Sequence, residues 1–365
     1  MKEEVKGYAL RMKESDGDTE TISGSDIDIE YVADDSVEKL IKKQNPLLWI
    51  TGLWKQQNIE SSVGVKYDKD KLAKVIENLD CMAEENQIPS VSAKPEFTGE
   101  KFEVAAEQIG TAIDKDKFAE TVTKAINGFQ SEVDLMKEDC YILPKYTKDS
   151  PEVAKACEKM NSELGANITL DFSPNTEVVD SSVISQWITV DDNMQVTFNQ
   201  DAVKQYIADL AAKYDTVGKT RNFTTATGNV VQVEGGGYGW KIDQDAEYNA
   251  LITNIQNAET VTREPNYSSR AATHDANDWG TTYAEVDLTA QHMYFIQNGQ
   301  VAMQCDIVTG NPNKGNATPQ GMYSLYYKQQ NQVLRGKKLE DGTYEYESPV
   351  DYWMRVTYSG VGFHD

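Results

Sequence analysis

The spacing of apolar residues divides the chain into a long first part with helical periodicity and a shorter last part with strand periodicity. In the first part, residues 203–210 carry apolar side chains at three- and four-residue spacing, which gives a helix one apolar face. Asp68, Asp201 and Asp243 stand near the start of such segments and are candidates to cap them, because a short carboxylate accepts the first free amide hydrogens.

From Thr281 onward the apolar spacing changes to two residues, which is typical of β-strands. Alternating segments at 292–296 and 300–308 flank Asn298-Gly299, the strongest short hairpin signal. A further strand is predicted at 322–327, and no long helix is visible here. We therefore expect a β-rich last domain.

Three blocks of the first part recur in the same order, which indicates an internal repeat. The blocks pair Tyr8–Ile27 with Asn167–Ile184, Tyr67–Leu72 with Phe198–Val203, and Phe102–Asp116 with Val231–Asp245. The offset falls from 157 residues in the first block to 131 in the second, so the first copy carries about 26 extra residues around Val32–Gln57. We expect an α+β fold with two tandem repeat domains, at 1–150 and 160–270, and a last domain at 280–365.

Composition excludes some functions. Lys and Arg number 35 against 59 Asp and Glu, a net charge of −24, which repels nucleic-acid phosphates, so we expect no nucleic-acid partner. The longest strongly apolar stretch, about Pro46–Trp54, is far short of the ~20 residues that a membrane helix needs.

The spacing of the cysteines, histidines and carboxylates does not by itself indicate a metal site or a catalytic pair. The four cysteines and three histidines lack zinc-ligand spacing, so no metal site is expected. A disulfide among Cys81, Cys140 and Cys157 stays open, and Cys305 is expected to be a small buried residue in a strand. Nothing in the spacing favours a carboxylate pair for glycoside hydrolysis.

Several motifs carry a resemblance to a known family. The segment Gly239-Trp-Lys-Ile-Asp243 resembles the peptidoglycan-binding domain found in tandem upstream of L,D-transpeptidase catalytic domains. Motifs at 283–293, Val-Thr-Gly-Asn-Pro (308–312), Ala-Thr-Pro-x-Gly (317–321) and Gly-Val-Gly-Phe-His-Asp (360–365) resemble the catalytic domain of L,D-transpeptidases, in that family's order. The resemblance implies an incomplete β-sandwich-like catalytic domain. It implies peptidoglycan cross-linking, in which a cysteine is acylated by a stem tetrapeptide, D-Ala leaves, and an amine accepts the acyl group.

The resemblance also assigns catalytic roles. His364 matches the family's general base, and Asp365 matches the residue whose backbone carbonyl orients it. The family's nucleophile lies in a Ser-His-Gly-Cys motif downstream, whereas this chain stops at Asp365, and Cys305 does not fit that motif. We therefore expect the chain to be inactive, and to be an internal fragment of a longer enzyme, anchored in the membrane and acting extracellularly on the cell-wall side. The mechanism implies no cofactor.

Other residues near the end of the chain keep two interpretations. Tyr352, Trp353, Met354 and Tyr358 either line the groove for the stem peptide or belong to the core. Arg335 and Lys337-Lys338, expected on a loop, either attract the acidic stem peptide or form a solvated basic turn. His292 is expected to be a packing or surface residue, and His274 has no assigned role.

Two other functions compete with the enzyme. The chain could be a protein that binds peptidoglycan without turnover, or a spacer whose repeats hold a catalytic domain away from the membrane. Sacculus binding by residues 1–270 would separate these two. We also expect residues 280–365 alone to fold with poor cooperativity, because a sheet edge and an apolar face would stay uncovered.

Overall fold

The computed structural model describes residue 5 and residues 7–32 and 64–365. The chain forms two compact units, Met1–Glu158 with Asp192–Gln195, and Lys159–Asp191 with Val196–Asp365. Most of the insertion expected at Val32–Gln57, and the apolar stretch Pro46–Trp54, lie outside the described residues. Among the helices that are described, none combines the length and the hydropathy that crossing a membrane requires.

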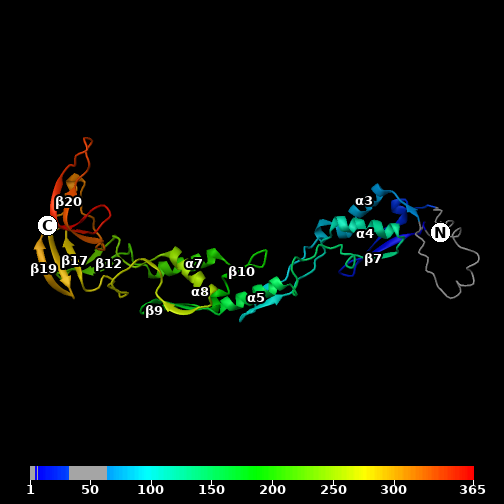
Figure 1. The fold of residues 1–365 in the computed structure, drawn as a ribbon, viewed down its shortest axis with the longest axis horizontal. Helices are drawn as coiled ribbons and strands as arrows, with labels where there is room; N and C mark the ends of the chain where they lie inside the picture. The colour runs from blue at the N-terminus through cyan, green and yellow to red at the C-terminus, as the bar shows by residue number, and fades with distance from the viewer. Residues whose placement is uncertain (1–4, 6, 33–63) are drawn as a thin grey trace, which may run out of the picture. The chain divides into compact units, whose positions relative to one another are not determined.

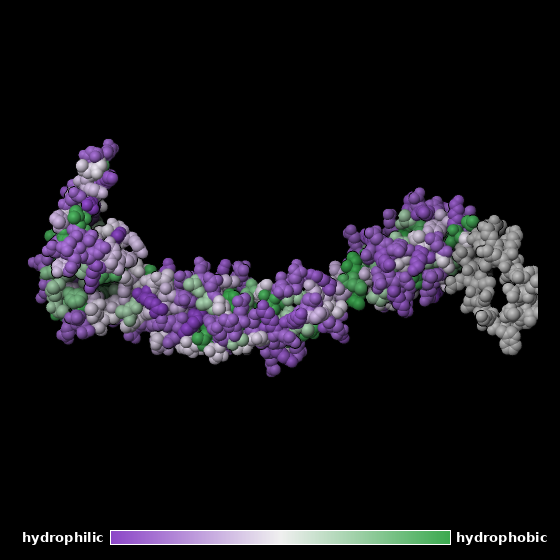
Figure 2. Space-filling view, in the orientation of Figure 1, coloured by the Kyte–Doolittle hydropathy of each residue, from purple (hydrophilic) through white to green (hydrophobic). Residues whose placement is uncertain are grey.

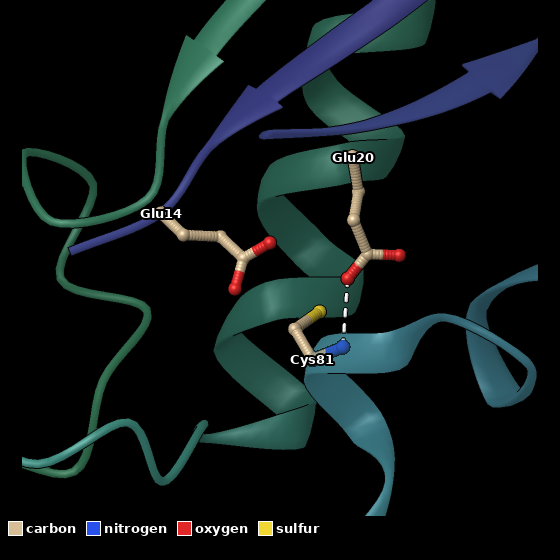
Figure 3. Close-up of side chains that lie close together, drawn as sticks. All are labelled: Glu14, Glu20 and Cys81. Atoms are coloured by element: carbon tan, nitrogen blue, oxygen red, sulfur yellow. Dashed lines mark hydrogen bonds between the residues drawn. The ribbon is translucent and has the colours of Figure 1, made fainter. Parts of the chain in front are cut away.

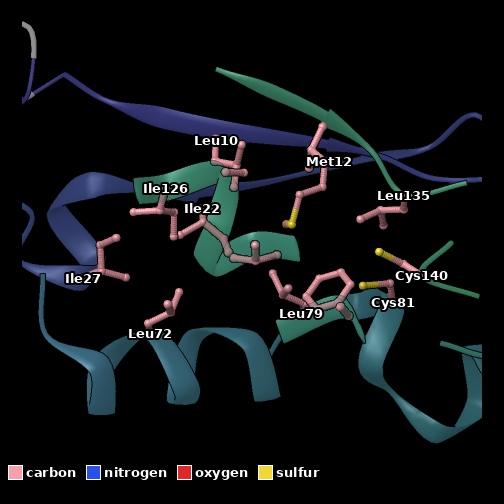
Figure 4. Close-up of a cluster of buried hydrophobic side chains, with 14 of the residues drawn as sticks. Leu10, Met12, Ile22, Ile27, Leu72, Leu79, Cys81, Ile126, Leu135 and Cys140 are labelled. Carbon is pink, nitrogen blue, oxygen red and sulfur yellow. The ribbon is translucent and has the colours of Figure 1, made fainter. Parts of the chain in front are cut away.

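The first unit places helices against a small sheet (Figure 1). Its elements are β1 (Ala9–Lys13), β2 (Thr19–Ser23), η1 (Gly24–Ile27), β3 (Glu30–Tyr31), β4 (Val65–Lys66), α3 (Lys69–Glu77), η4 (Asp80–Met82), η5 (Glu84–Asn86), β5 (Lys94–Phe97), β6 (Phe102–Ala105), α4 (Lys115–Asn127) and β7 (Glu132–Asp134). β1 pairs with β2 antiparallel and with β7 parallel. Leu10, Met12 and Ile22 of this sheet are buried in one cluster with Phe118 and Ile126 of α4 (Figure 4).

The second unit begins with the same arrangement. Its elements up to residue 269 are β8 (Asn167–Phe172), β9 (Asn175–Val179), α6 (Ser181–Ile184), β10 (Ile188–Val190), β11 (Val196–Phe198), α7 (Gln200–Tyr214), β12 (Arg221–Thr224), β13 (Val230–Val233), β14 (Lys241–Ile242), α8 (Gln244–Gln256), β15 (Thr260–Arg263) and β16 (Tyr267–Ser269). β8 pairs antiparallel with β9 and parallel with β15, as β1 does with β2 and β7. α5 (Pro151–Leu164) runs from the first unit into the second. The repeated α+β fold is confirmed, whereas the domain boundaries remain a prediction.

Two three-stranded antiparallel sheets follow. One contains β17 (Tyr283–Asp287), β18 (His292–Gln297) and β19 (Gln300–Asp306), and the other β20 (Tyr327–Arg335), β21 (Glu347–Arg355) and β22 (Gly362–His364). The hairpin at Asn298-Gly299 is confirmed, since β18 pairs with β19 across it and both residues have positive φ. The only helix in residues 281–365 is the short η6 (Pro312–Lys314), so this β-rich part is also as predicted.

Asp68 and Asp243 cap α3 and α8, as predicted, because their side chains accept hydrogen bonds from backbone amides of the first turn. The prediction for Asp201 was wrong. α7 is capped by Asn199, whose side chain accepts from the amide of Ala202, and Asp201 lies inside the first turn.

Two predictions about strands were also wrong. The strand expected at 322–327 begins only at Tyr327, because the backbone of Met322 bonds instead to Gly235 and Tyr238. Cys305 is exposed rather than buried, because all of β19 is exposed. All four cysteines are free thiols. The face of the molecule shown in Figure 2 is mainly hydrophilic over both units, as the composition leads one to expect.

Candidate active site

His364 is held on β22 opposite a buried tryptophan. In the antiparallel pairing of β21 and β22, His364 lies directly across from Trp353, so the two side chains share a face of the sheet. Their ring centroids are 6.1 Å apart, and Trp353 is only 8% exposed. The strand pairing and this ring contact fix where the imidazole lies.

The imidazole is oriented by a backbone carbonyl. His364 Nδ1 lies 2.8 Å from the backbone oxygen of Asp365. A carbonyl oxygen only accepts hydrogen bonds, so Nδ1 carries the proton in the neutral ring and Nε2 keeps its lone pair. A histidine in this tautomer can take a proton through Nε2, which is what a general base must do.

The side chain of Asp365 has a separate, structural role. Its carboxylate accepts hydrogen bonds from the backbone amides of Tyr352 (2.9 Å) and Asp351 (3.1 Å). The Tyr352 amide, and then the Asp351 amide, hold the pKa of this carboxyl below its usual range. The Asp365 side chain therefore anchors to β21 the same residue whose backbone oxygen orients His364. We did not predict this contact.

The four predicted substrate-binding residues do not lie together. Trp353 shares the face of His364, whereas Tyr352 and Met354, one position away on either side, point to the opposite face. Tyr352 is 55% exposed. Tyr358 lies after β21, is 83% exposed, and contacts the ring of Tyr326 at 4.7 Å. The structure therefore brings only Trp353 of these four to the imidazole.

The motifs at 308–312 and 317–321 form one braced loop. Gln291 donates a hydrogen bond to Oγ1 of Thr309 (2.7 Å) and accepts one from the Thr309 amide (3.0 Å). The next amide, of Gly310, donates to Oγ1 of Thr318 (2.9 Å). A Cβ on Gly310 would lie 1.9 Å from the backbone oxygen of Asn316, so glycine is required at this position. These residues hold the loop that links the two sheets.

Arg335 is the last residue of β20, not a loop residue as we predicted. It is paired across the strands with Glu347, at 2.8 Å between Nε and Oε1, and both side chains are about half exposed. An ion pair this exposed contributes little stability. Because its charge is already paired, Arg335 is a weak candidate for attracting a substrate.

None of the four cysteines lies on the sheet that carries His364. Cys81, Cys140 and Cys157 belong to the first unit. Cys305 lies on β19, in the other sheet, and is exposed. The described residues therefore place a histidine in base geometry without a thiol on the same sheet.

Glu14, Glu20 and Cys81 form a set of potential metal ligands in the first unit (Figure 3). Their ligand atoms lie within 4.8 Å of one another. Glu20 already accepts hydrogen bonds from the backbone amides of Asp80 (3.0 Å) and Cys81 (2.7 Å). Burial raises the pKa of the Cys81 thiol, and burial, followed by the charge of Glu20, raises the pKa of Glu14 to about 7. Because one carboxylate is engaged and the thiol stays protonated, we assign no ion to this cluster.

The second unit contains a buried ion pair that we did not predict. Arg221 on β12 donates to both carboxylate oxygens of Asp278, at 2.8 and 2.7 Å, and each side chain is less than 10% exposed. Thr216 donates to the same carboxylate at 2.6 Å, and the hydroxyl of Tyr238 donates to the Asp278 backbone oxygen. We call Arg221, Asp278, Thr216 and Tyr238 the junction. Its partners are up to 62 residues apart, and no local motif marks them.

Within this unit, the second repeat contacts the β-rich part at two places. The amide of Ala226 donates to Glu285 on β17 at 2.8 Å, and the ring of Phe223 contacts Tyr283 edge-on at 5.6 Å. Further along, the backbones of Met322 and Gly235 are hydrogen bonded. The hairpin β12–β13 and the following glycines therefore position the strands that precede the candidate site.

Comparison with family models gives two matches. The model described as "Putative peptidoglycan binding domain" matches twice, at residues 20–134 and 146–263. The model of the L,D-transpeptidase catalytic domain matches residues 281–365. Together the matches cover most of the chain and follow the order of the repeats and the β-rich part. No curated protein matches.

Solved structures from Enterococcus faecium are similar in sequence. The crystal structure of a cysteine-to-serine mutant of its L,D-transpeptidase is 35% identical, over 57% of this chain and 80% of that chain, with a TM-score of 0.42. The avibactam carbamoyl form of the enzyme is 34% identical, over 58% and 80%, with a TM-score of 0.44. The NMR structure of the E. faecium catalytic domain is 46% identical, over 23% of this chain and 61% of that chain, with a TM-score of 0.20.

Proposed function

This chain belongs to the L,D-transpeptidase family, and from that premise we propose that His364 is the general base of its acyl transfer. The family's function is peptidoglycan cross-linking, which places the protein at the cell wall. The observation that supports the role of His364 is the 2.8 Å contact between its Nδ1 and the Asp365 carbonyl. That contact leaves Nε2 free to accept a proton.

The proposed reaction has two halves. A cysteine thiol gives its proton to the base, and its sulfur attacks the carbonyl carbon that precedes the terminal D-Ala of a stem tetrapeptide. The C–N bond breaks, D-Ala leaves with the proton on its amine, and a thioester remains. The amine of a second stem then attacks the thioester, loses a proton to the base, and restores the thiol.

We infer that the 365-residue chain does not carry out this reaction, because none of its cysteines lies on the sheet of His364. The exposed Cys305 provides the test. Incubation with a carbapenem, followed by mass spectrometry of the intact chain, should give no stoichiometric adduct. An adduct that forms in the wild type and disappears in Cys305→Ala would overturn this inference and make Cys305 the nucleophile.

The role of His364 is tested in a form of the protein that carries the family's Ser-His-Gly-Cys segment. His364→Ala should lower kcat/KM for D-Ala release by about 10²–10⁴-fold, the usual contribution of a general base. Asp365→Ala is the comparison variant, because it keeps the backbone carbonyl that orients His364 and removes only the side chain that binds the β21 amides, so it should lower the rate by less than His364→Ala does. A rate that is unchanged in His364→Ala would refute the assignment.

A second candidate function is peptidoglycan binding without turnover, which the placement of the cysteines favours. The two peptidoglycan-binding matches alone cover 20–134 and 146–263. This alternative predicts that the chain sediments with purified sacculi and releases no D-Ala from them. We further propose that a membrane anchor holds the enzyme at the cell surface through a segment outside these residues. Fractionation of cells that express the natural gene would test this.

A further inference from the structure

A groove opens between α3 and α4 of the first unit, the two helices that lie beside each other in Figure 1. It has a volume of about 470 Å³. Its apolar lining includes Leu72, Ala73 and Ile76 of α3, together with Ala119 of α4. A cavity of this size, with charged groups among its lining, can hold a short peptide or a sugar.

The residues that line the groove differ from those at the matching positions of the second repeat. The capping residues align the two copies: Asp68 with Asn199, and Asp114 with Asp243. Counted from these caps, the fifth residue in the first copy is Ala73 on α3 and Ala119 on α4. In the second copy the same positions are Lys204 and Tyr248.

Those two residues touch in the second repeat. The ammonium of Lys204 lies over the ring of Tyr248, 5.6 Å from its centroid, so the pair occupies the space between α7 and α8. The first repeat has alanine at both positions, so no such pair of long side chains lies between α3 and α4. In addition, α7 and α8 are packed more closely than α3 and α4. The groove therefore reflects both the looser packing of the two helices and the smaller side chains at these positions.

The two repeats also differ in charge at the positions that begin these helices. The first residue after each cap is Lys69 or Lys115 in the first copy, and both line the groove. The second copy has glutamine at both positions. Within the described part of the chain, neither lysine forms an ion pair.

The acidic residues near the caps, in contrast, are the same in both repeats. An aspartate stands second after the cap in all four helices, at Asp70, Asp116, Asp201 and Asp245, where it suits a helix start. Glu77 is the only carboxylate among the lining residues. The ionisable lining therefore carries +1 in a chain whose net charge is −24.

We propose that this groove binds the acidic stem peptide of peptidoglycan, an inference that rests on the proposed function. The two ammonium groups match the carboxylates of such a peptide. The alkyl lining of Leu72, Ala73 and Ile76 matches the small apolar side chains of its alanines. The first repeat thus recognises the peptide, rather than the glycan, and brings the stem to the enzyme.

The test uses the full 365-residue chain and three probes: intact purified sacculi, soluble tetrapeptide stems, and glycan strands from which an amidase has removed the peptides. Sedimentation measures binding to sacculi, and calorimetry measures the Kd for the soluble probes. We expect binding to sacculi and to tetrapeptides, and no binding to the stripped glycan. Binding to stripped glycan equal to that of sacculi would overturn the choice of ligand.

Two double variants test the groove itself, and each copies the second repeat. Lys69→Gln with Lys115→Gln should raise the Kd for the tetrapeptide about tenfold, the effect expected of two partly exposed ion pairs. Ala73→Lys with Ala119→Tyr should abolish binding by filling the space. The matched control is Lys74→Gln with Lys124→Gln, which removes the same charge from the same helices at positions outside the groove lining, and it should bind as the wild type does.

The outcomes separate this inference from the proposed function. If the wild-type chain fails to bind sacculi and tetrapeptides, the groove assignment is refuted, whereas the role of His364 is decided separately by the kinetics of His364→Ala. If it binds sacculi and the charge variant binds the tetrapeptide as tightly as the wild type, only the groove assignment fails. The charge variant keeps the test valid if the filling variant does not fold, because it changes only the ends of two groove-lining lysine side chains.

Discussion

Removing the carboxylate of Asp278 should destabilise the second unit by about 4 kcal/mol. Asp278→Ala leaves the Arg221 guanidinium buried without its partner, a change that typically costs about 3–5 kcal/mol. The hydroxyl of Thr216 loses its acceptor at the same time, which adds roughly 1 kcal/mol. Arg221 keeps its bonds to the carbonyls of Lys219 and Tyr238, which offset part of the loss.

The double variant Arg221→Met with Asp278→Leu should be less destabilised than Asp278→Ala alone. It removes both charges and replaces them with apolar side chains, so no unpaired ion stays buried. We expect a cost of about 1–2 kcal/mol, mainly from imperfect packing. The difference between these two variants measures the penalty of the unpaired Arg221.

Hydrogen exchange at the junction is the assay, because it reports local opening and does not require the two compact units to unfold together. The amides of Ala272 and Thr273 both bond to the Asp278 carbonyl and act as probes. Their protection should fall by about three orders of magnitude in Asp278→Ala, since 1.4 kcal/mol corresponds to tenfold. A decrease of less than tenfold, or a double variant as unprotected as the single one, would refute the reasoning.

Three further predictions concern other parts of the chain. Because the pKa of Glu14 is raised to about 7, the folded state holds a proton that the unfolded state releases, so stability falls as pH rises from about 4.5 to 7. Glu14→Gln should remove this fall and raise the stability of the folded chain by about 1 kcal/mol at pH 8, allowing for the partial exposure of Glu14. Thermal melts of the wild type and the variant at pH 5 and pH 8 measure the difference. Gly236→Ala should lower the melting temperature because its Cβ would lie 1.9 Å from a backbone oxygen, whereas Gly237→Ala, with open space, should not. Iodoacetamide should label the exposed Cys305 before the buried Cys140, and the reverse order by peptide mapping would contradict the fold.

The parts of the fold that depend on local chemistry were predictable from the sequence. Asp68 and Asp243 cap helices because each carboxylate accepts an amide within three residues. Asn298-Gly299 forms a hairpin because both residues accept positive φ. Asp201 was misassigned because Asn199 stands two positions earlier, so one helix turn offered two possible caps and the sequence did not decide between them.

Features that depend on distant contacts were not predictable. Alternation along β19 shows which residues share a face, but not whether another layer covers that face, so Cys305 was wrongly expected to be buried. By contrast, the contact between Nδ1 of His364 and the backbone oxygen of Asp365 joins adjacent residues, and the family resemblance led us to expect it. The ion pair of Arg221 with Asp278 joins residues 57 positions apart, and nothing near either residue marks it.

The two repeats use the same element to contact the segment that follows each of them. In the first repeat, the backbone oxygen of Phe102 on the hairpin β5–β6 accepts a hydrogen bond from the Cys157 thiol on α5, the helix that follows. In the second repeat, the matching hairpin β12–β13 contacts Tyr283 and Glu285, again in the segment that follows. The hairpin is thus the connecting element in both copies.

The helix pair is the element that varies, since α3 and α4 of the first repeat line a groove, whereas α7 and α8 of the second are packed more closely and carry the contact between Lys204 and Tyr248. Ligand binding and domain connection therefore lie on separate elements and share no residue. It follows that Ala73→Lys with Ala119→Tyr should leave the exchange protection of the junction unchanged. Conversely, Asp278→Ala should leave the tetrapeptide Kd unchanged, and a shift of more than threefold in that Kd would show that the two elements are coupled.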